Sequence, residues 1–272
     1  MKNTFIFLIL ITLTLVLPDT PLANPWIGIS LQRIIFVLLA VSSIQLLGVV
    51  ILNRLSSHSG VMLLGLISGM ISSTAFTVTL AKKSKIHPEQ SSVDSLGFFT
   101  ATLAMLGNGL ILMLITEPAV PRSTLLLFIV PFLITLILLI KRAVHTKSQI
   151  VNPPHLSLDW MSITKLALIV CMILIASYWV KIYSGDLGLK VITFFVGALE
   201  IHGSIVANTQ LFANKELNLK TFNDLISICI TASYLAKLSI VYLLGCPYLK
   251  KKITLWTTPI LSGLFITWMI IN

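Results

Sequence analysis

The stretch LKVITFFVGALEIHGSIVANTQLF, residues Leu189–Phe212, decides the fold class. It exceeds the roughly 20 residues that an α-helix needs to cross a bilayer. Its centre holds Glu200, an acidic residue deep inside an apolar run, with His202 two places on. An ionisable residue at membrane depth is costly and therefore marks a candidate functional site.

The whole chain shares this character. Of its 272 residues, 56% are hydrophobic and 10% are charged, with a mean hydropathy of +0.99. Soluble domains carry roughly 25% charged residues. The apolar residues form continuous runs rather than the alternation of a membrane β-barrel. We therefore predict an all-α polytopic transmembrane helix bundle that forms a single integral membrane domain over residues 1–272.

The runs predict about nine spans. Eight of them are Leu31–Leu52, Val61–Ala81, Ser95–Thr116, Leu125–Ile140, Met161–Ile182, Leu189–Phe212, Phe222–Gly245 and Leu255–Ile271. Residues 1–29 are either a first span or a signal-like segment. Their apolar run, Phe5–Leu17, is short for a span, but Pro21 fits a signal-peptidase site poorly, which favours a retained helix.

The sequence also indicates an internal duplication. Gly60 and Gly69 recur 128 residues later as Gly188 and Gly197, and Pro131 recurs at the same offset as Pro259. We predict two repeats, residues 30–145 and 158–272, preceded by an N-terminal helix. Four spans in each unit would make the repeats parallel, both running the same way through the membrane.

The duplication pairs the charged residues of the second half with neutral polar residues of the first. Glu200 corresponds to Ser72 and His202 to Thr74, and Lys237 corresponds to Asn108 where one inserted residue makes the offset 129; Ser73 lies within the same polar group. We expect these positions to line a common interior. Small residues at Gly65, Gly69, Gly197 and Gly203 are predicted to allow close helix packing.

Glu200 and Lys237 lie at similar depths if adjacent spans are antiparallel, about 16 and 12 Å from one membrane surface. They could form a buried ion pair that fixes helix register, or part of a proton or ion pathway. His202 points about 200° away from Glu200 on a regular helix, so the two meet only if the helix breaks between Gly197 and Gly203. No second acid or cysteine accompanies them, so we expect no metal site and no cofactor.

The remaining composition excludes several functions. The net charge of +10 comes from cations in loops and at span ends, which is typical of contacts with lipid headgroups and not of nucleic-acid binding. Counted along nine crossings, ten cations fall on one face and eight on the other, too even to set orientation. No phosphate loop, nucleophile elbow or metalloprotease motif is present in the sequence, and we do not expect an enzyme.

Several motifs together resemble a known family. They are Leu17-Pro-Asp-Thr-Pro21, Gly65-Leu-Ile-Ser-Gly-Met-Ile-Ser-Ser-Thr-Ala75, Leu80-Ala-Lys-Lys83, Gly197 followed by Glu200, and Lys237. The chain resembles domain-of-unknown-function family 4010, a multi-pass bacterial membrane domain associated with MgtC/SapB proteins. It departs from that family in having Glu200-x-His202 in place of Asp-x-Asp and Asn108 where arginine is common.

Two functions are compatible with these features. The first is a transporter or ion-permeation protein of the bacterial inner membrane that uses the Glu200, His202 and Lys237 cluster. The second, implied by the resemblance, is a non-transporting membrane regulator or partner of MgtC-like proteins in stress or magnesium response. Besides such a protein, the only partner expected is the lipid bilayer.

Overall fold

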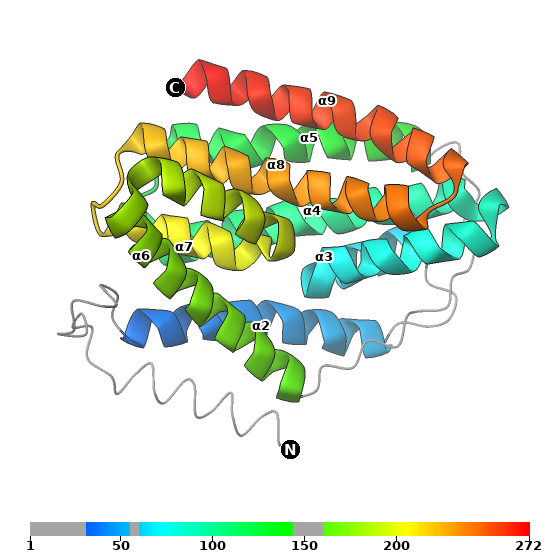
Figure 1. Ribbon diagram of the computed structural model, residues 1–272. Coiled ribbons are helices and arrows are strands. Elements are labelled where there is room, and N and C mark those ends of the chain that lie inside the picture. The colour runs from blue at the N-terminus through cyan, green and yellow to red at the C-terminus, as the bar shows by residue number, and fades with distance from the viewer. Residues whose placement is uncertain (1–30, 55–59, 144–159) are drawn as a thin grey trace.

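A computed structural model describes residues 31–54, 60–143 and 160–272, and within these ranges every regular element is a helix (Figure 1). The predicted first span or signal-like segment lies outside the described residues. The elements are α2 (Leu31–Arg54), α3 (Val61–Ile86), η1 (Pro88–Gln90), α4 (Ser91–Thr116), α5 (Arg122–Ala143), α6 (Trp160–Leu199), α7 (Ile201–Ala213), α8 (Leu219–Leu244) and α9 (Pro247–Ile271). Helices therefore form in all eight described segments where spans were predicted.

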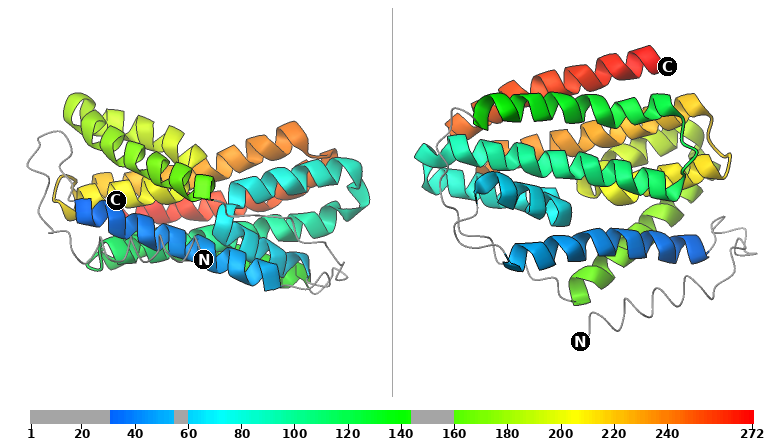
Figure 2. Two further views of the ribbon diagram at one scale, coloured as in Figure 1. Left: turned by 90° about the horizontal axis from the view of Figure 1, so that it is seen from below. Right: turned by 180° about the vertical axis from the view of Figure 1, so that it is seen from behind.

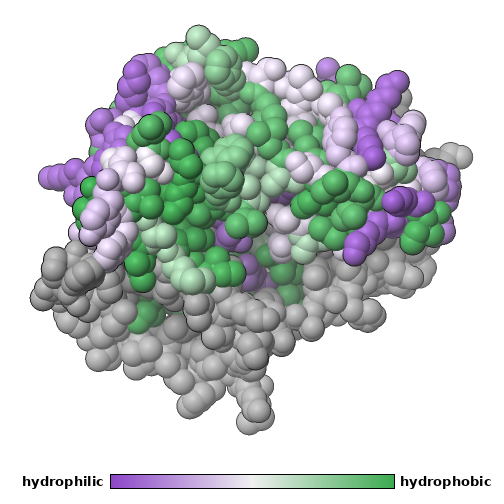
Figure 3. Space-filling model, in the orientation of Figure 1, coloured by the Kyte–Doolittle hydropathy of each residue, from purple (hydrophilic) through white to green (hydrophobic). Residues whose placement is uncertain are grey.

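The helices form a membrane bundle. Six described segments are long and apolar enough to cross a membrane, judged by length and composition. On the face shown in Figure 3, hydrophobic residues cover the middle, and polar residues gather toward the two ends of the helices. This distribution fits a bilayer whose normal runs along the helix axes.

α3 does not cross the bundle, because it folds back on itself at Ser72. That residue has extended dihedral angles, φ −161° and ψ 99°, inside an otherwise helical segment. A Cβ placed on Gly97 of α4 would lie 3.0 Å from Val61 and 3.4 Å from Leu80, one residue from each arm. In a straight helix those two residues would be about 28 Å apart. We call residues 61–86 hairpin 1 and Ser72 its tip.

A second hairpin follows α6. The chain turns at Gly185, where φ is +60°, a conformation open to glycine, and it breaks again at Glu200, with φ −142° and ψ 95°. Asn208 Nδ2 donates to Thr193 Oγ1 across 3.4 Å, although an unbroken helix would separate them by about 22 Å. Residues 186–213 are hairpin 2, with Glu200 at its tip.

The two hairpins enter the bundle from opposite ends. α4 and α8 are antiparallel, since Ser91 at the start of α4 lies 3.0 Å from Cys246 just after α8. Lys83 of hairpin 1 pairs with Asp94 near the start of α4, and Lys190 of hairpin 2 pairs with Asp224 near the start of α8. The views in Figures 1 and 2 show α3 confined to one half of the bundle and α7 to the other.

Three expectations are therefore corrected. The segments Val61–Ala81 and Leu189–Phe212 were predicted to be straight spans, and each is a hairpin that returns to the end it came from. The count of nine spans fails with them. The predicted parallel orientation of the two halves is also wrong, because α4 and α8, which correspond at the repeat offset, run in opposite directions.

Candidate functional site

The centre of the bundle is the crossing of α4 and α8. Met105 of α4 lies against Ser233 and Lys237, one turn apart on α8. Lys237 Nζ donates to Ser233 Oγ at 2.6 Å and to Met105 Sδ at 3.0 Å. Lys237 is 0% exposed to solvent. A lysine amine without any solvent contact is thus held by neutral groups at the middle of the bundle.

Both hairpin tips reach this crossing. Asn108 Nδ2 donates to the carbonyl of Met70, two residues before the tip of hairpin 1, across 3.3 Å. The next residue, Gly109, faces hairpin 2, since a Cβ there would lie 2.8 Å from Ile205. Two adjacent residues of α4 therefore contact the two hairpins, one each.

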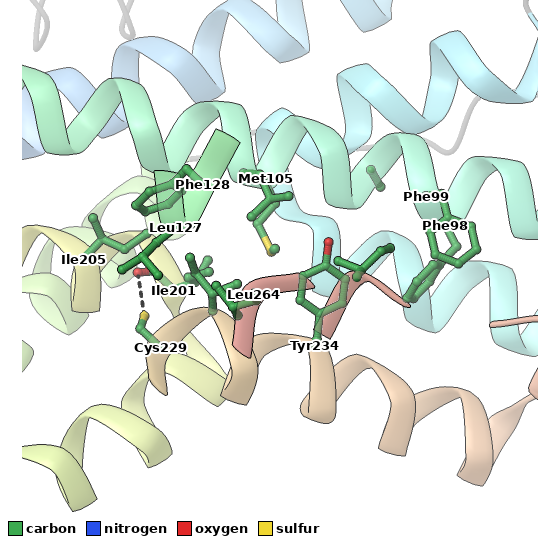
Figure 4. Packing of buried hydrophobic residues seen from close by; sticks show 14 of the residues in the cluster. Phe98, Phe99, Met105, Leu127, Phe128, Ile201, Ile205, Cys229, Tyr234 and Leu264 are labelled. Carbon is green, nitrogen blue, oxygen red and sulfur yellow. Dashed lines mark hydrogen bonds between the residues drawn. The ribbon is translucent and has the colours of Figure 1, made fainter. Parts of the chain in front are cut away.

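α8 makes the corresponding contact with hairpin 2. Cys229 Sγ lies 3.6 Å from the carbonyl oxygen of Ile201, the residue after the tip, as the dashed line in Figure 4 shows. Backbone at membrane depth needs partners within the protein when a helix is interrupted. Asn108 supplies one to the carbonyl of Met70, just before the break at Ser72, while Cys229 contacts a carbonyl in the first turn of α7.

Glycines allow the hairpins to approach this closely. A Cβ on Gly69 would lie 2.5 Å from the carbonyl oxygen of Ala101, and one on Gly197 would lie 3.0 Å from Cys229. Gly65 is similarly close to Gly97 and Thr100. The predicted packing role of these three glycines fits this geometry, and Gly203 is buried in α7.

Each tip residue caps the helix that follows it. Ser72 Oγ accepts from Ala75 N at 3.3 Å, and Glu200 Oε1 accepts from His202 N at 3.1 Å. Such caps satisfy N–H groups that the helix itself leaves free. Both breaks thus create a helix N-terminus, which carries partial positive charge, inside the bundle.

The break brings Glu200 and His202 together, which a regular helix would not. Glu200 Oε1 lies 3.3 Å from His202 Nδ1, and their side chains are 25% and 10% exposed. His202 Nε2 is buried and has no hydrogen-bond partner. No group of three potential metal ligands is found among the described residues.

The predicted ion pair between Glu200 and Lys237 is not formed. The carboxylate of Glu200 is turned to the start of α7, and Lys237 lies two turns beyond Cys229 on α8. Ser73 is buried near the tip of hairpin 1, where its carbonyl accepts from Thr77 Oγ1, and Thr74 is half-buried beside it. The polar residues therefore gather around one crossing without making one charged cluster.

Sequence reasoning missed Met105, Ser233 and the pair formed by Thr193 and Asn208. Met105 and Ser233 lie on the two helices that the repeat relates, but the offset of 129 that pairs Asn108 with Lys237 places Met105 opposite Tyr234, so the repeat does not single out this contact. Thr193 and Asn208 carry no signal until the fold-back is known.

Comparison with known families covers this entire core. The profile described as Domain of unknown function (DUF4010) matches residues 39–245, from α2 to the end of α8. The chain belongs to the DUF4010 family. No curated protein and no solved structure matches it. In this DUF4010 protein the matched region holds both hairpins and the crossing of α4 with α8, so these features belong to the family's domain.

Proposed function

We propose that this protein is a transporter in which the two hairpins give access to a central site from opposite sides of the bacterial inner membrane. The observation that carries the proposal is the meeting of two oppositely entering hairpins at Asn108 and Gly109 of α4. Interrupted helices that meet near the bilayer midplane are typical of secondary transporters. Transport by alternating access needs such a site between two movable barriers.

We propose further that the two halves form an inverted repeat. Each half then contains one crossing helix, one hairpin and two more crossing helices, which is an odd number of crossings. The tips Ser72 and Glu200 are 128 residues apart, and Asn108 and Lys237 on the two crossing helices are 129 residues apart. An inverted repeat supplies two equivalent states, open to one side or the other, from a single asymmetric structure.

The hairpins also change the distribution of charge between the two sides. At the end where hairpin 1 enters, the described helices and loops hold ten cations: Arg54, Lys82, Lys83, Lys85, Lys141, Arg142, Lys165, Lys250, Lys251 and Lys252. At the other end they hold six: Arg33, Arg122, Lys181, Lys190, Lys215 and Lys220. We propose that the hairpin 1 end faces the cytoplasm. A reporter fused at Asn272 should then be periplasmic, and a cytoplasmic reporter would reverse the assignment.

A cysteine near the tip of hairpin 1 tests the transport proposal. Ser73→Cys would be introduced after the three native cysteines are replaced by alanine, and membrane vesicles of each orientation would be treated with an impermeant thiol reagent. Ser73 is buried, so labelling requires a tip to open. We expect slow labelling from both sides, while Glu89→Cys at the exposed base of the hairpin reacts from one side only.

Labelling of Ser73→Cys from one side, or from neither, would contradict alternating access. The regulatory alternative would then take its place, provided that crosslinking captures one reproducible MgtC-like membrane partner. Proton or cation flux in liposomes should likewise exceed that of protein-free controls if the protein transports.

A further inference from the structure

The two hairpin tips differ in charge. Hairpin 1 carries only hydroxyl side chains at its tip, whereas hairpin 2 carries Glu200 and His202 within 3.3 Å of each other. The ionisable side chains at the two tips therefore belong to hairpin 2 alone. The two tips therefore differ in side-chain chemistry, although the backbone is extended at both Ser72 and Glu200.

The contacts of the His202 ring show which of its nitrogens lacks a hydrogen-bond partner. Nδ1 faces the carboxylate of Glu200, so in the neutral ring we assign the proton to Nδ1. That leaves a lone pair on Nε2, and this atom is buried without a partner. A buried polar atom without a partner is rare and points to a species absent from the resting arrangement.

The surroundings contain few other groups that titrate. α8 presents Cys229, whose sulfur contacts Ile201, and Lys237 two turns further along the same face. α8 also carries Tyr234, and its charged residues Lys220 and Asp224 lie at its start. The charged residues Asp94 of α4 and Lys181, Asp186 and Lys190 of α6 lie at or beside the hairpin bases. A proton arriving at the tip would therefore be received by His202.

Protonation changes the charge of the tip from −1 to zero. Glu200 with a neutral imidazole is a net anion, which is costly in apolar surroundings unless a cation such as Lys237 is nearby. Glu200 with an imidazolium is a neutral pair. The protonated tip loses its attraction to Lys237 and can leave the crossing.

We propose that His202 Nε2 is the binding site of a coupling proton, oriented by Glu200, which hairpin 2 takes from one side of the membrane and releases to the other. The proposal rests on the transport function above. The proton adds to the Nε2 lone pair, Nδ1 keeps its own proton toward Glu200, and release restores the neutral ring. Glu200 acts here as a positioning residue.

Solid-state ¹⁵N NMR of the histidine-labelled full-length protein in lipid tests this directly. The exposed pair His87 and Glu89 is a matched control, with the same spacing in sequence and 3.4 Å between Nδ1 and Oε1, but with side chains 52% and 66% exposed. At alkaline pH, His202 should show protonated Nδ1 and bare Nε2. On acidification from alkaline to mildly acidic pH, both nitrogens should become protonated.

Two variants identify the signal and the role of Glu200. His202→Gln should remove one resonance pair and leave the others, which assigns it. Glu200→Gln should leave a protonatable ring but weaken the preference for Nδ1, so that a Nε2-protonated signal appears at alkaline pH.

A His202 ring with its neutral proton on Nε2, or one that takes up no second proton over this range, would overturn the proposal. A ring that behaves as expected in a protein whose Ser73→Cys is labelled from one side only would instead refute transport while leaving the proton site intact.

Discussion

The contact between hairpin 1 and α4 gives the sharpest prediction about stability. In Gly69→Ala the new Cβ would lie 2.5 Å from the carbonyl oxygen of Ala101 and 2.6 Å from its Cα. Ordinary contacts begin near 3.4 Å, so the hairpin must move away by about 1 Å. Both neighbouring atoms are backbone, and no side-chain rotation can relieve the clash.

Overpacking of this kind costs about 1–3 kcal/mol. Gly107→Ala on α4 is the matched control, because its Cβ would meet nothing closer than Phe132 at 3.9 Å. Removing a glycine from a helix interior should there stabilise by about 0.5–1 kcal/mol. Gly197→Ala should fall between them, since its Cβ would lie 3.0 Å from Cys229.

Reversible unfolding in mixed detergent micelles, followed by circular dichroism, would measure the three free energies of unfolding. The expected order of stability is Gly107→Ala, then Gly197→Ala, then Gly69→Ala. If Gly69→Ala were as stable as Gly107→Ala, hairpin 1 would not pack on α4 as described.

Two further substitutions probe the charges. Lys190→Met should lower the free energy of unfolding by roughly 1–2 kcal/mol, because it removes the cation 2.6 Å from Asp224. The control Lys220→Met removes an exposed cation at the same end of the bundle and should change that free energy by no more than about 0.5 kcal/mol. Equal effects would show that the Lys190 pair does not stabilise the fold. Lys237→Met should leave the unfolding free energy unchanged or raise it, since replacing a buried ion by an apolar side chain of similar volume is neutral or stabilising by about 1–4 kcal/mol. A loss of more than about 2 kcal/mol would instead identify the ammonium as a structural hydrogen-bond donor.

Much of the fold could be predicted from hydrophobicity alone. Helices form wherever the sequence has long apolar runs, and α8 and α9 begin within a few residues of polar or proline signals such as Asn218 and Pro247. The correspondence between Ser72 and Glu200 was also predicted from the sequence, because Gly60 and Gly69 recur at the same offset of 128 residues. These features are local, or depend on composition, and need no knowledge of packing.

Chain direction could not be predicted in the same way. Leu189–Phe212 has the length and apolarity of a span, and a single extended residue at Glu200 turns it into a hairpin. Neither glycine nor proline occupies that break. The side chain of Glu200 accepts from His202 N at the start of α7, and Gly197 beside the break packs on Cys229 of α8, so tertiary contacts accompany the break.

The assumption of straight spans also affected the prediction of the candidate site. The depths calculated for Glu200 and Lys237 assumed straight neighbouring spans, and the fold-back redirects Glu200 to cap α7. The contact between Glu200 and His202, by contrast, was foreseen as the consequence of a helix break. Asymmetry between the two tips was visible in the sequence, because it depends on residue identity alone.

The most direct test of two opposed hairpins is the sidedness of their bases. Glu89 follows hairpin 1, Lys215 follows hairpin 2, and both residues are exposed. Straight spans would put both positions on the same side of the membrane, whereas opposed hairpins put them on opposite sides. With single cysteines at these positions, an impermeant thiol reagent should label Glu89→Cys and Lys215→Cys in vesicles of opposite orientation. Labelling of both from the same side would contradict the hairpins, and with them the proposed transport mechanism.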